Sequence, residues 1–245
     1  MTNFKIQMPN QQQMSNQYQN LRLIIGILFV IWILTLGISE TVFAAPQFLV
    51  SWQAKSYAPN WYQGKILPTK GSSLTVSFEL VDGGKIADLS RAKVRWYVND
   101  KLVKNETDGL GIKSLDISVP DYGGQETAIR ISLPDYAASP LDYVVRIPVK
   151  SPEVVIDGRS TPLKAGDNSF EAIPFYFNAS DLNNLAFDWS ANGDRAANNT
   201  DTPWLLNLSI DPNTPPGFAV SLQVAVQSFL NQLEFASKTM RLGVK

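Results

Sequence analysis

The stretch Leu74–Leu80, which reads Leu-Thr-Val-Ser-Phe-Glu-Leu, decides the fold class of this sequence. Apolar and polar side chains alternate along it, and the turn-forming run Asp82-Gly83-Gly84 follows. Successive side chains of a β-strand point to opposite faces of a sheet, so a period of two places all the apolar side chains on one face. The pattern therefore predicts a strand that buries one face against a core.

The same alternation recurs along most of the chain. Further strands are predicted at residues 92–98, 115–119, 127–133 and 143–147, and then at 175–177, 185–189, 204–210, 219–226 and 239–244. The stretch 227–237 has mixed spacing and is interpreted as two strand ends around Asn231. Short strands separated by Pro, Gly, Asn and Asp predict an all-β sandwich, and no helix is expected after residue 46.

A weak internal repeat predicts two copies of one module. Trp96-Tyr-Val-Asn99-Asp100 matches Trp189-Ser-Ala-Asn192-Gly193 at an offset of 93 residues. Ile117-Ser-Val-Pro120 resembles the segment from Leu208 to Pro212 at an offset of 91 to 92. Two matches at similar offsets predict sandwiches over residues 46–150 and 151–245, with Trp96 and Trp189 as the large rings that fill each core.

The Trp-x-x-Asn-Gly/Asp pattern, with a following Gly109-Leu-Gly111 turn and a strand closing at Val119-Pro120, resembles bacterial Ig-like and polycystic-kidney-disease-type repeats. The resemblance covers most of residues 70–245, and it implies tandem Ig-like sandwiches in an extracytoplasmic setting. It implies no activity, because such modules host many functions. The antibody-type cysteine pair that flanks the tryptophan is missing, since the sequence has no Cys.

The first 45 residues resemble an export leader. Residues 1–21 are rich in Asn and Gln and are expected to be disordered. The apolar run Leu23–Ile38 follows Arg22, and its 16 residues span about 24 Å as a helix, against a hydrocarbon core of about 30 Å. Residues 22–44 are therefore predicted to be a signal peptide cleaved after Ala44, with an uncleaved signal anchor as the alternative.

Composition excludes several classes of chemistry. The 245 residues include neither His nor Cys, which rules out His-dependent nucleophilic triads, thiol nucleophiles, disulfides and the usual zinc sites. The formal net charge is −1, and no run of like charges appears, so nothing in the charge favours nucleic acid or an anionic membrane. No catalytic residue, cofactor site or metal site is predicted.

Two kinds of binding site are considered. Trp52, Tyr57, Trp61 and Tyr62 place four rings within eleven residues, in what Pro59 and Gly64 suggest is a loop or an irregular edge strand. Such rings stack on sugars or anchor a protein partner, although they also serve to cover a core. Ca²⁺ is the one metal considered, because oxygen ligands gather in two loops: Asp181, Asn183 and Asn184, and Asp194, Asn198, Asn199 and Asp201.

These observations favour an exported, non-catalytic Ig-like protein with a structural, adhesive or protein-interaction role at the cell envelope. Its expected partner is an envelope protein or a glycan, and its expected contact with the membrane is through the N-terminal segment alone. A carbohydrate-binding module that uses the exposed aromatic side chains is the alternative. A hydrolase of unrecognised type is the third hypothesis.

Overall fold

The computed structural model describes residues 45–158, 162–197 and 200–245. The predicted lead of residues 1–21, the apolar segment of residues 22–44 and the cleavage site after Ala44 lie outside the described residues. Residues 46–245 form a compact unit of their own. Among the described residues, no helix has the length and apolarity that a membrane span requires.

The regular secondary structure of the described residues is almost entirely β. The first half holds β1 (Gln47–Lys55), β2 (Ser73–Asp82), β3 (Lys85–Ile86), β4 (Arg95–Val98), β5 (Lys101–Lys104), β6 (Ser114–Ser118), β7 (Glu126–Leu133) and β8 (Leu141–Pro148). The second half holds β9 (Glu153–Gly158), β10 (Gly166–Phe175), β11 (Leu185–Ala191), β12 (Asp194–Arg195), β13 (Leu205–Ile210), β14 (Ala219–Ser228) and β15 (Phe235–Gly243). The described helical structure is one 3-10 turn, Leu182–Asn184.

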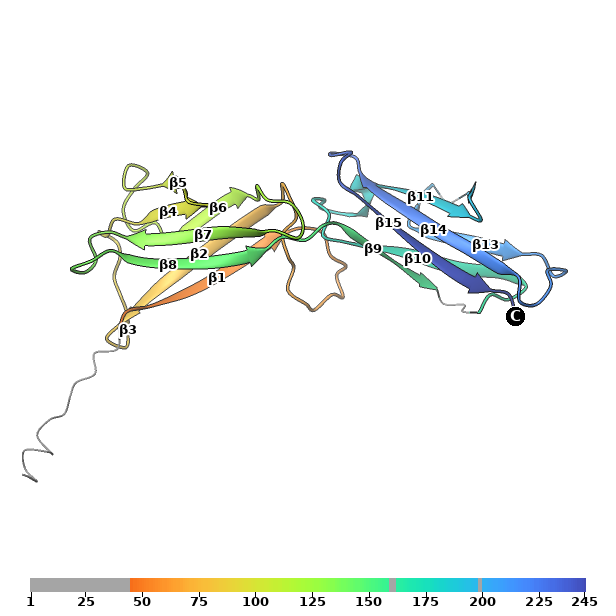
Figure 1. The fold of residues 1–245 in the computed structure, drawn as a ribbon, viewed down its shortest axis with the longest axis horizontal. Coiled ribbons are helices and arrows are strands. Elements are labelled where there is room, and N and C mark those ends of the chain that lie inside the picture. Colours follow the sequence, from red (N-terminus) through yellow and green to blue (C-terminus); the bar gives the residue numbers. More distant parts are fainter. Residues whose placement is uncertain (1–44, 159–161, 198–199) are drawn as a thin grey trace, which may run out of the picture. The chain divides into compact units, whose positions relative to one another are not determined.

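Each half builds two antiparallel sheets with the same chain order (Figure 1). In the first half, β2 lies between β1 and β6 and also pairs with the short β3, and the second sheet has the order β5-β4-β7-β8. In the second half, the orders are β13-β10-β9 and β12-β11-β14-β15. Two packed sheets joined in this order form an Ig-like sandwich, so the predicted all-β fold of tandem Ig-like sandwiches is confirmed.

Alternation along the strands produces two separate cores. The buried residues of one cluster run from Ala54 to Val149, those of the other run from Val154 to Val244, and no residue belongs to both. Trp96 and Trp189 are fully buried, one in each cluster. Each indole also has a hydrogen-bond partner, because Trp96 Nε1 donates to the Ile112 carbonyl at 2.9 Å and Trp189 Nε1 donates to the Pro203 carbonyl at 3.1 Å.

The repeated asparagines explain the Trp-x-x-Asn pattern. Asn99 and Asn192 open tight hairpin turns in which both central residues have positive φ. The Oδ1 atom of Asn99 accepts from the Ala128 amide at 2.9 Å, and the Asn99 amide donates to the Ala128 carbonyl at 2.8 Å. Asn192 makes the same pair of bonds with Ser221, both at 2.8 Å. Ala128 and Ser221 are 93 residues apart, so the sequence repeat is also a structural repeat.

Some strands differ from the prediction. The pattern did not predict five strands, namely β1, β3, β5, β9 and β12. The strand predicted at residues 175–177 shares only Phe175 with β10, which extends from Gly166 to Phe175 and ends where Tyr176 takes a φ of 60°. Pro174 obscured the pattern of β10, and β5 is too short and too exposed to show a buried face. The interpretation of residues 227–237 is confirmed, because β14 ends at Ser228 and β15 begins at Phe235.

Replacing Asn192 tests the turn. Asn192→Ala removes the side-chain oxygen that accepts from the Ser221 amide. It also places at φ 55° an alanine, which cannot offset the strain of that conformation with a side-chain hydrogen bond as asparagine does. We expect a loss of about 1–3 kcal/mol in the free energy of unfolding, measured by urea titration with circular dichroism. Asn207→Ala, which removes an exposed bond to the Ser169 side chain, is the control and should change stability by less than about 0.5 kcal/mol. Equal effects of the two substitutions would contradict this role.

Candidate functional site

Trp52 is held within the first sandwich. It lies on β1 and packs against the first core. The Lys65 ammonium lies over its ring, with Nζ 4.0 Å from the ring centroid, and donates to the Trp52 carbonyl at 2.6 Å. This ring is therefore covered on one face by a cation of the same chain.

Tyr57 joins the loop after β1 to the second sandwich. Its amide donates to the Phe177 carbonyl at 2.6 Å, and its carbonyl accepts from the Tyr176 amide at 2.7 Å. The Tyr57 side chain packs against the second core. Burial is the main reason that the pKa of its hydroxyl is raised, with a smaller effect of the nearby Asp181 and Glu171 charges.

Trp61 and Tyr62 meet the end of β10. The ring of Tyr62 lies edge-on to Phe175 at 5.5 Å between centroids, and Trp61 lies edge-on to the same ring at 6.2 Å. The hydroxyls of Tyr62 and Tyr176 are 3.2 Å apart, and burial together with this hydrogen bond raises the pKa of Tyr176 to about 12. We call Tyr57, Trp61, Tyr62, Phe175 and Tyr176 the aromatic clasp. Trp61 is 64% exposed, so within the clasp it offers the most open ring.

Among the described residues, the most exposed apolar side chains lie elsewhere, on the hairpin between β14 and β15. We call residues 229–235 the apolar loop. Four of its side chains are largely exposed: Phe229 65%, Leu230 79%, Leu233 89% and Phe235 64%. The sequence singled out this stretch only through its mixed spacing, which fits neither a strand face nor a helix face. Its exposure was not predicted.

Hydrogen bonds fix the backbone of the apolar loop. The Phe229 amide donates to the Asn184 carbonyl at 3.0 Å, which ties the loop to the 3-10 turn. The Glu234 amide donates to the Asn231 carbonyl at 2.9 Å, and the Glu234 carbonyl accepts from the Ser228 amide at 3.0 Å. Because these polar groups are satisfied within the chain, the apolar side chains extend from a defined backbone.

Glu234 is the buried acid beneath this loop. Only 6% of its surface is exposed, and its carboxylate accepts from the Asn178 amide. Burial raises the pKa of this carboxyl above the ordinary 4.5, and its bonds with the Asn178 amide and the Ser228 hydroxyl partly oppose the change. The carboxylate thus connects the apolar loop to the segment that follows the aromatic clasp.

A cleft of about 380 Å³ lies beside the apolar loop. Leu233 and Phe235 form part of its wall, and Tyr122 and Pro152 contribute further apolar surface. The Lys70 ammonium lies over the Tyr122 ring, with Nζ 3.1 Å from the centroid. The arrangement suits contact with an apolar surface that carries a polar or acidic group at its rim.

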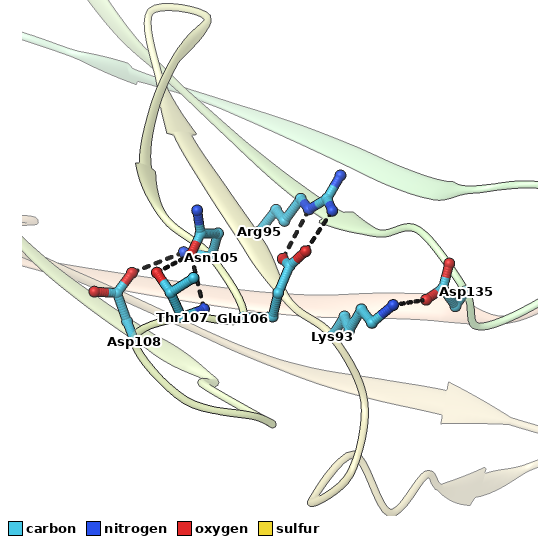
Figure 2. Close-up of polar contacts among 7 residues, drawn as sticks. All are labelled: Lys93, Arg95, Asn105, Glu106, Thr107, Asp108 and Asp135. Carbon is cyan, nitrogen blue, oxygen red and sulfur yellow. Dashed lines mark hydrogen bonds and ion pairs between the residues drawn. The ribbon is translucent and has the colours of Figure 1, made fainter.

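Two ion pairs lie at and beside β4 in the first sandwich, as Figure 2 shows. Arg95 donates two hydrogen bonds to the Glu106 carboxylate, and this pairing lowers the pKa of Glu106 to about 2. Lys93 pairs with Asp135 at 2.7 Å. These charges neutralise one another on the surface, so we assign the cluster no binding role.

The structure describes all the candidate ligands of the first loop considered for Ca²⁺ and only part of those of the second. Asp181 caps the 3-10 turn, and its Oδ1 accepts from the Asn183 amide at 2.7 Å. Asp194 lies in the short strand β12, while Asn198 and Asn199 lie outside the described residues. Among the described residues, no three acidic side chains gather into a metal-binding group.

Comparison with known proteins finds similarity of fold only. No family model matches the chain, and no curated protein matches it. Three domains of the outer capsid protein Hoc of bacteriophage RB49 match 81% of this chain at 14% identity, with a TM-score of 0.42, and the match spans 59% of that chain. Fibronectin(III)-like modules of Clostridium thermocellum CbhA match 80% of this chain and 93% of theirs at 10% identity and a TM-score of 0.28. Murine CEACAM1b matches 80% of this chain over its full length at 12% identity and a TM-score of 0.29.

The buried carboxylate predicts a pH dependence. Because the pKa of folded Glu234 is raised above 4.5, its contribution to stability is present at low pH and is lost as pH rises through the folded pKa. Glu234→Gln keeps an oxygen acceptor for the Asn178 amide without the charge. The free energy of unfolding of the wild type relative to this variant should therefore fall as the pH rises above 4.5, the ordinary pKa of the carboxyl in the unfolded chain.

Urea titrations at several pH values measure this difference. Glu126→Gln removes an exposed carboxylate on β7 and serves as the control for the loss of one charge. A difference between wild type and Glu234→Gln that stays constant with pH would show that the carboxylate is not held in a desolvated position.

Proposed function

We propose that this protein is an exported, non-catalytic interaction module that binds a protein partner through the apolar loop. The observation that carries the proposal is the exposure of Phe229, Leu230, Leu233 and Phe235 on one ordered hairpin. Large exposed apolar patches on soluble proteins mark interaction surfaces, because they are otherwise a liability for aggregation. The apolar leader predicted for residues 22–44 supports export to the cell envelope.

The energetics of the apolar loop favour binding. Covering one Phe or Leu side chain is worth about 1.5–3 kcal/mol, and four such side chains project from one short segment. The hydrogen bonds of Ser228, Asn231 and Glu234 already fix the backbone, so little conformational entropy remains to be lost on association. An apolar patch that includes two Phe side chains and no exposed charge matches the buried core of a protein interface, which is depleted in charged residues and enriched in aromatic ones.

The surroundings indicate the chemistry of the partner. Glu234 is the only charged residue of the apolar loop, and it is buried. The adjoining cleft adds Tyr122 and Pro152, with Lys70 at its edge. The partner is therefore a protein that presents an apolar surface with an acidic or carbonyl group where it meets Lys70.

Site-specific crosslinking tests this function. A benzophenone side chain in place of Leu230 in residues 45–245 should give adducts of discrete mass after illumination in an envelope extract of the source organism. Leu233→Asp in the same chain should abolish the adducts and change stability by less than about 0.5 kcal/mol, because Leu233 is 89% exposed.

The matched control carries the benzophenone in place of Leu102, which is exposed at 43% on β5 of the other sandwich. Adducts that form equally from positions 102 and 230, or that survive Leu233→Asp, would count against the apolar loop as the contact surface.

Glycan binding through the aromatic clasp is the second candidate function. It is supported by the exposed Trp61 ring, which Phe175 holds from the side at 6.2 Å. If this function holds, Trp61→Ala should lower the affinity for a glycan at least tenfold in isothermal titration calorimetry, because the ring supplies the stacking surface. Trp52→Phe is the control, since Trp52 packs within the first sandwich. A glycan array without any hit, or binding unchanged by Trp61→Ala, removes the candidate.

A further inference from the structure

The strand β1 is the outer strand of its sheet. It pairs with β2 along all nine of its residues, from Gln47 opposite Val81 to Lys55 opposite Ser73. Within the described residues, β1 is assigned no strand partner on its other side. An outer strand presents a row of backbone N–H and C=O groups to any further strand that approaches it.

The register shows which residues of β1 direct these groups outward. In an antiparallel ladder, the N–H and C=O of one residue point to the same side, and the side alternates along the strand. The Phe78 amide donates to the Lys113 carbonyl at 3.0 Å, so the backbone of Phe78 faces away from β1. Phe78 lies opposite Val50, and the backbone groups of Val50 therefore point to the open edge.

The alternation extends this assignment to Phe48 and Trp52. Lys65 supports it independently, because its ammonium donates to the Trp52 carbonyl at 2.6 Å from outside the sheet. Lys65 thereby closes the edge at Trp52. The open part of the edge is limited to the backbone groups of Phe48 and Val50, with the 57% exposed Leu49 between them on the outer face.

This part of β1 lacks the charged side chains that usually keep an outer strand from pairing with another molecule. Residues 47–53 carry no charge. The equivalent first strand of the second sandwich, β9, contains Glu153 and Asp157 and packs along β15. The edge strand β8 contains Asp142 and Arg146. Charges of this kind discourage pairing between molecules, and the open part of β1 carries none. The neighbouring strand β8 contacts this part through its side chains, since the Phe48 ring stacks on Tyr143 at 5.4 Å between centroids, and β8 is not assigned to the backbone edge of β1.

We propose that β1 pairs with β1 of a second copy of this chain, antiparallel and centred on Leu49. In this register, Phe48 of each copy lies opposite Val50 of the other, and their outward groups form four N–H···O=C bonds. The two Leu49 side chains meet on the two-fold axis at a non-hydrogen-bonded position. The open β1 edge of each copy is therefore the binding surface for the other.

The residues at the two ends of the proposed β1–β1 pairing are compatible with it. The next outward residue before Phe48 is Pro46, which has no N–H to donate. In this register it faces Trp52 of the second copy, whose carbonyl already accepts from Lys65. Gln47 lies opposite Ser51, so no like charges meet. The contact is short, and we therefore expect a weak dimer that depends on concentration. It uses a different sandwich from the apolar loop and stands independently of the proposed function.

A single cysteine tests the register, because the natural sequence has none. Residues directly opposite at a non-hydrogen-bonded position have Cα atoms about 4.5 Å apart, which is within the range of a disulfide. Leu49→Cys in residues 45–245 should form a covalent dimer under mild oxidation. Ser51→Cys is the matched control on the same outer face, since in this register the two introduced thiols lie about 13 Å apart along the strands.

Charge at the same position tests the association itself. Leu49→Lys and Leu49→Glu should each weaken the dimer roughly tenfold in sedimentation equilibrium, because like charges then meet on the axis. An equal mixture of the two variants should restore association. Circular dichroism checks the fold of each variant. The proposal is overturned if the wild type stays monomeric at every concentration, or if Leu49→Cys crosslinks no faster than Ser51→Cys.

Discussion

The bond between an asparagine side chain and the neighbouring strand is the constraint on which both sandwiches depend. Asn99 and Asn192 each use their backbone amide and their Oδ1 atom to hold one residue of the adjacent strand, Ala128 or Ser221. This fixes the hairpin turn and the register of two central strands together. The tryptophan three residues earlier then faces the core, because side chains along a strand alternate. One short motif thus sets both the strand pairing of the sheet and the position of the ring that fills the core.

The two sandwiches differ in their edge strands and in one loop. In the second sandwich, β9 packs along β15, and the parallel bridge between Leu163 and Val244 helps to close that side. In the first sandwich, Lys65 covers the corresponding edge at Trp52, and the described residues place no further strand beside β1 in its sheet. The second sandwich instead exposes apolar side chains to solvent on its apolar loop. Neither the open edge nor the apolar loop belongs to the two buried cores, and contact with other molecules is the role that we propose for them.

The sequence predicts the strands that have a buried face better than it predicts which side chains are exposed. Strands with one buried face, such as β2 and β14, follow the period of two and were found, whereas β5 has no buried face to reveal it. The sequence predicts an aromatic cluster near residue 60. It does not predict that Trp52 packs on the first core while Tyr57 of the aromatic clasp packs on the second, because this separation depends on long-range packing. Phe229 and Leu233 belong to residue types usually buried, so composition alone points away from their exposure.

Glu234 gives the strongest reason to regard the apolar loop as a built surface. A carboxylate loses hydration when it is buried, and this one lies at the base of the loop, bonded to the Asn178 amide. A hairpin that needed only to connect β14 with β15 would be satisfied by a short polar turn. The observed hairpin retains a buried acid and leaves four large apolar side chains in water. The exposed side chains oppose solubility in the isolated chain, and the buried acid holds the loop to the segment at Asn178, which together support the proposal that the loop binds a partner.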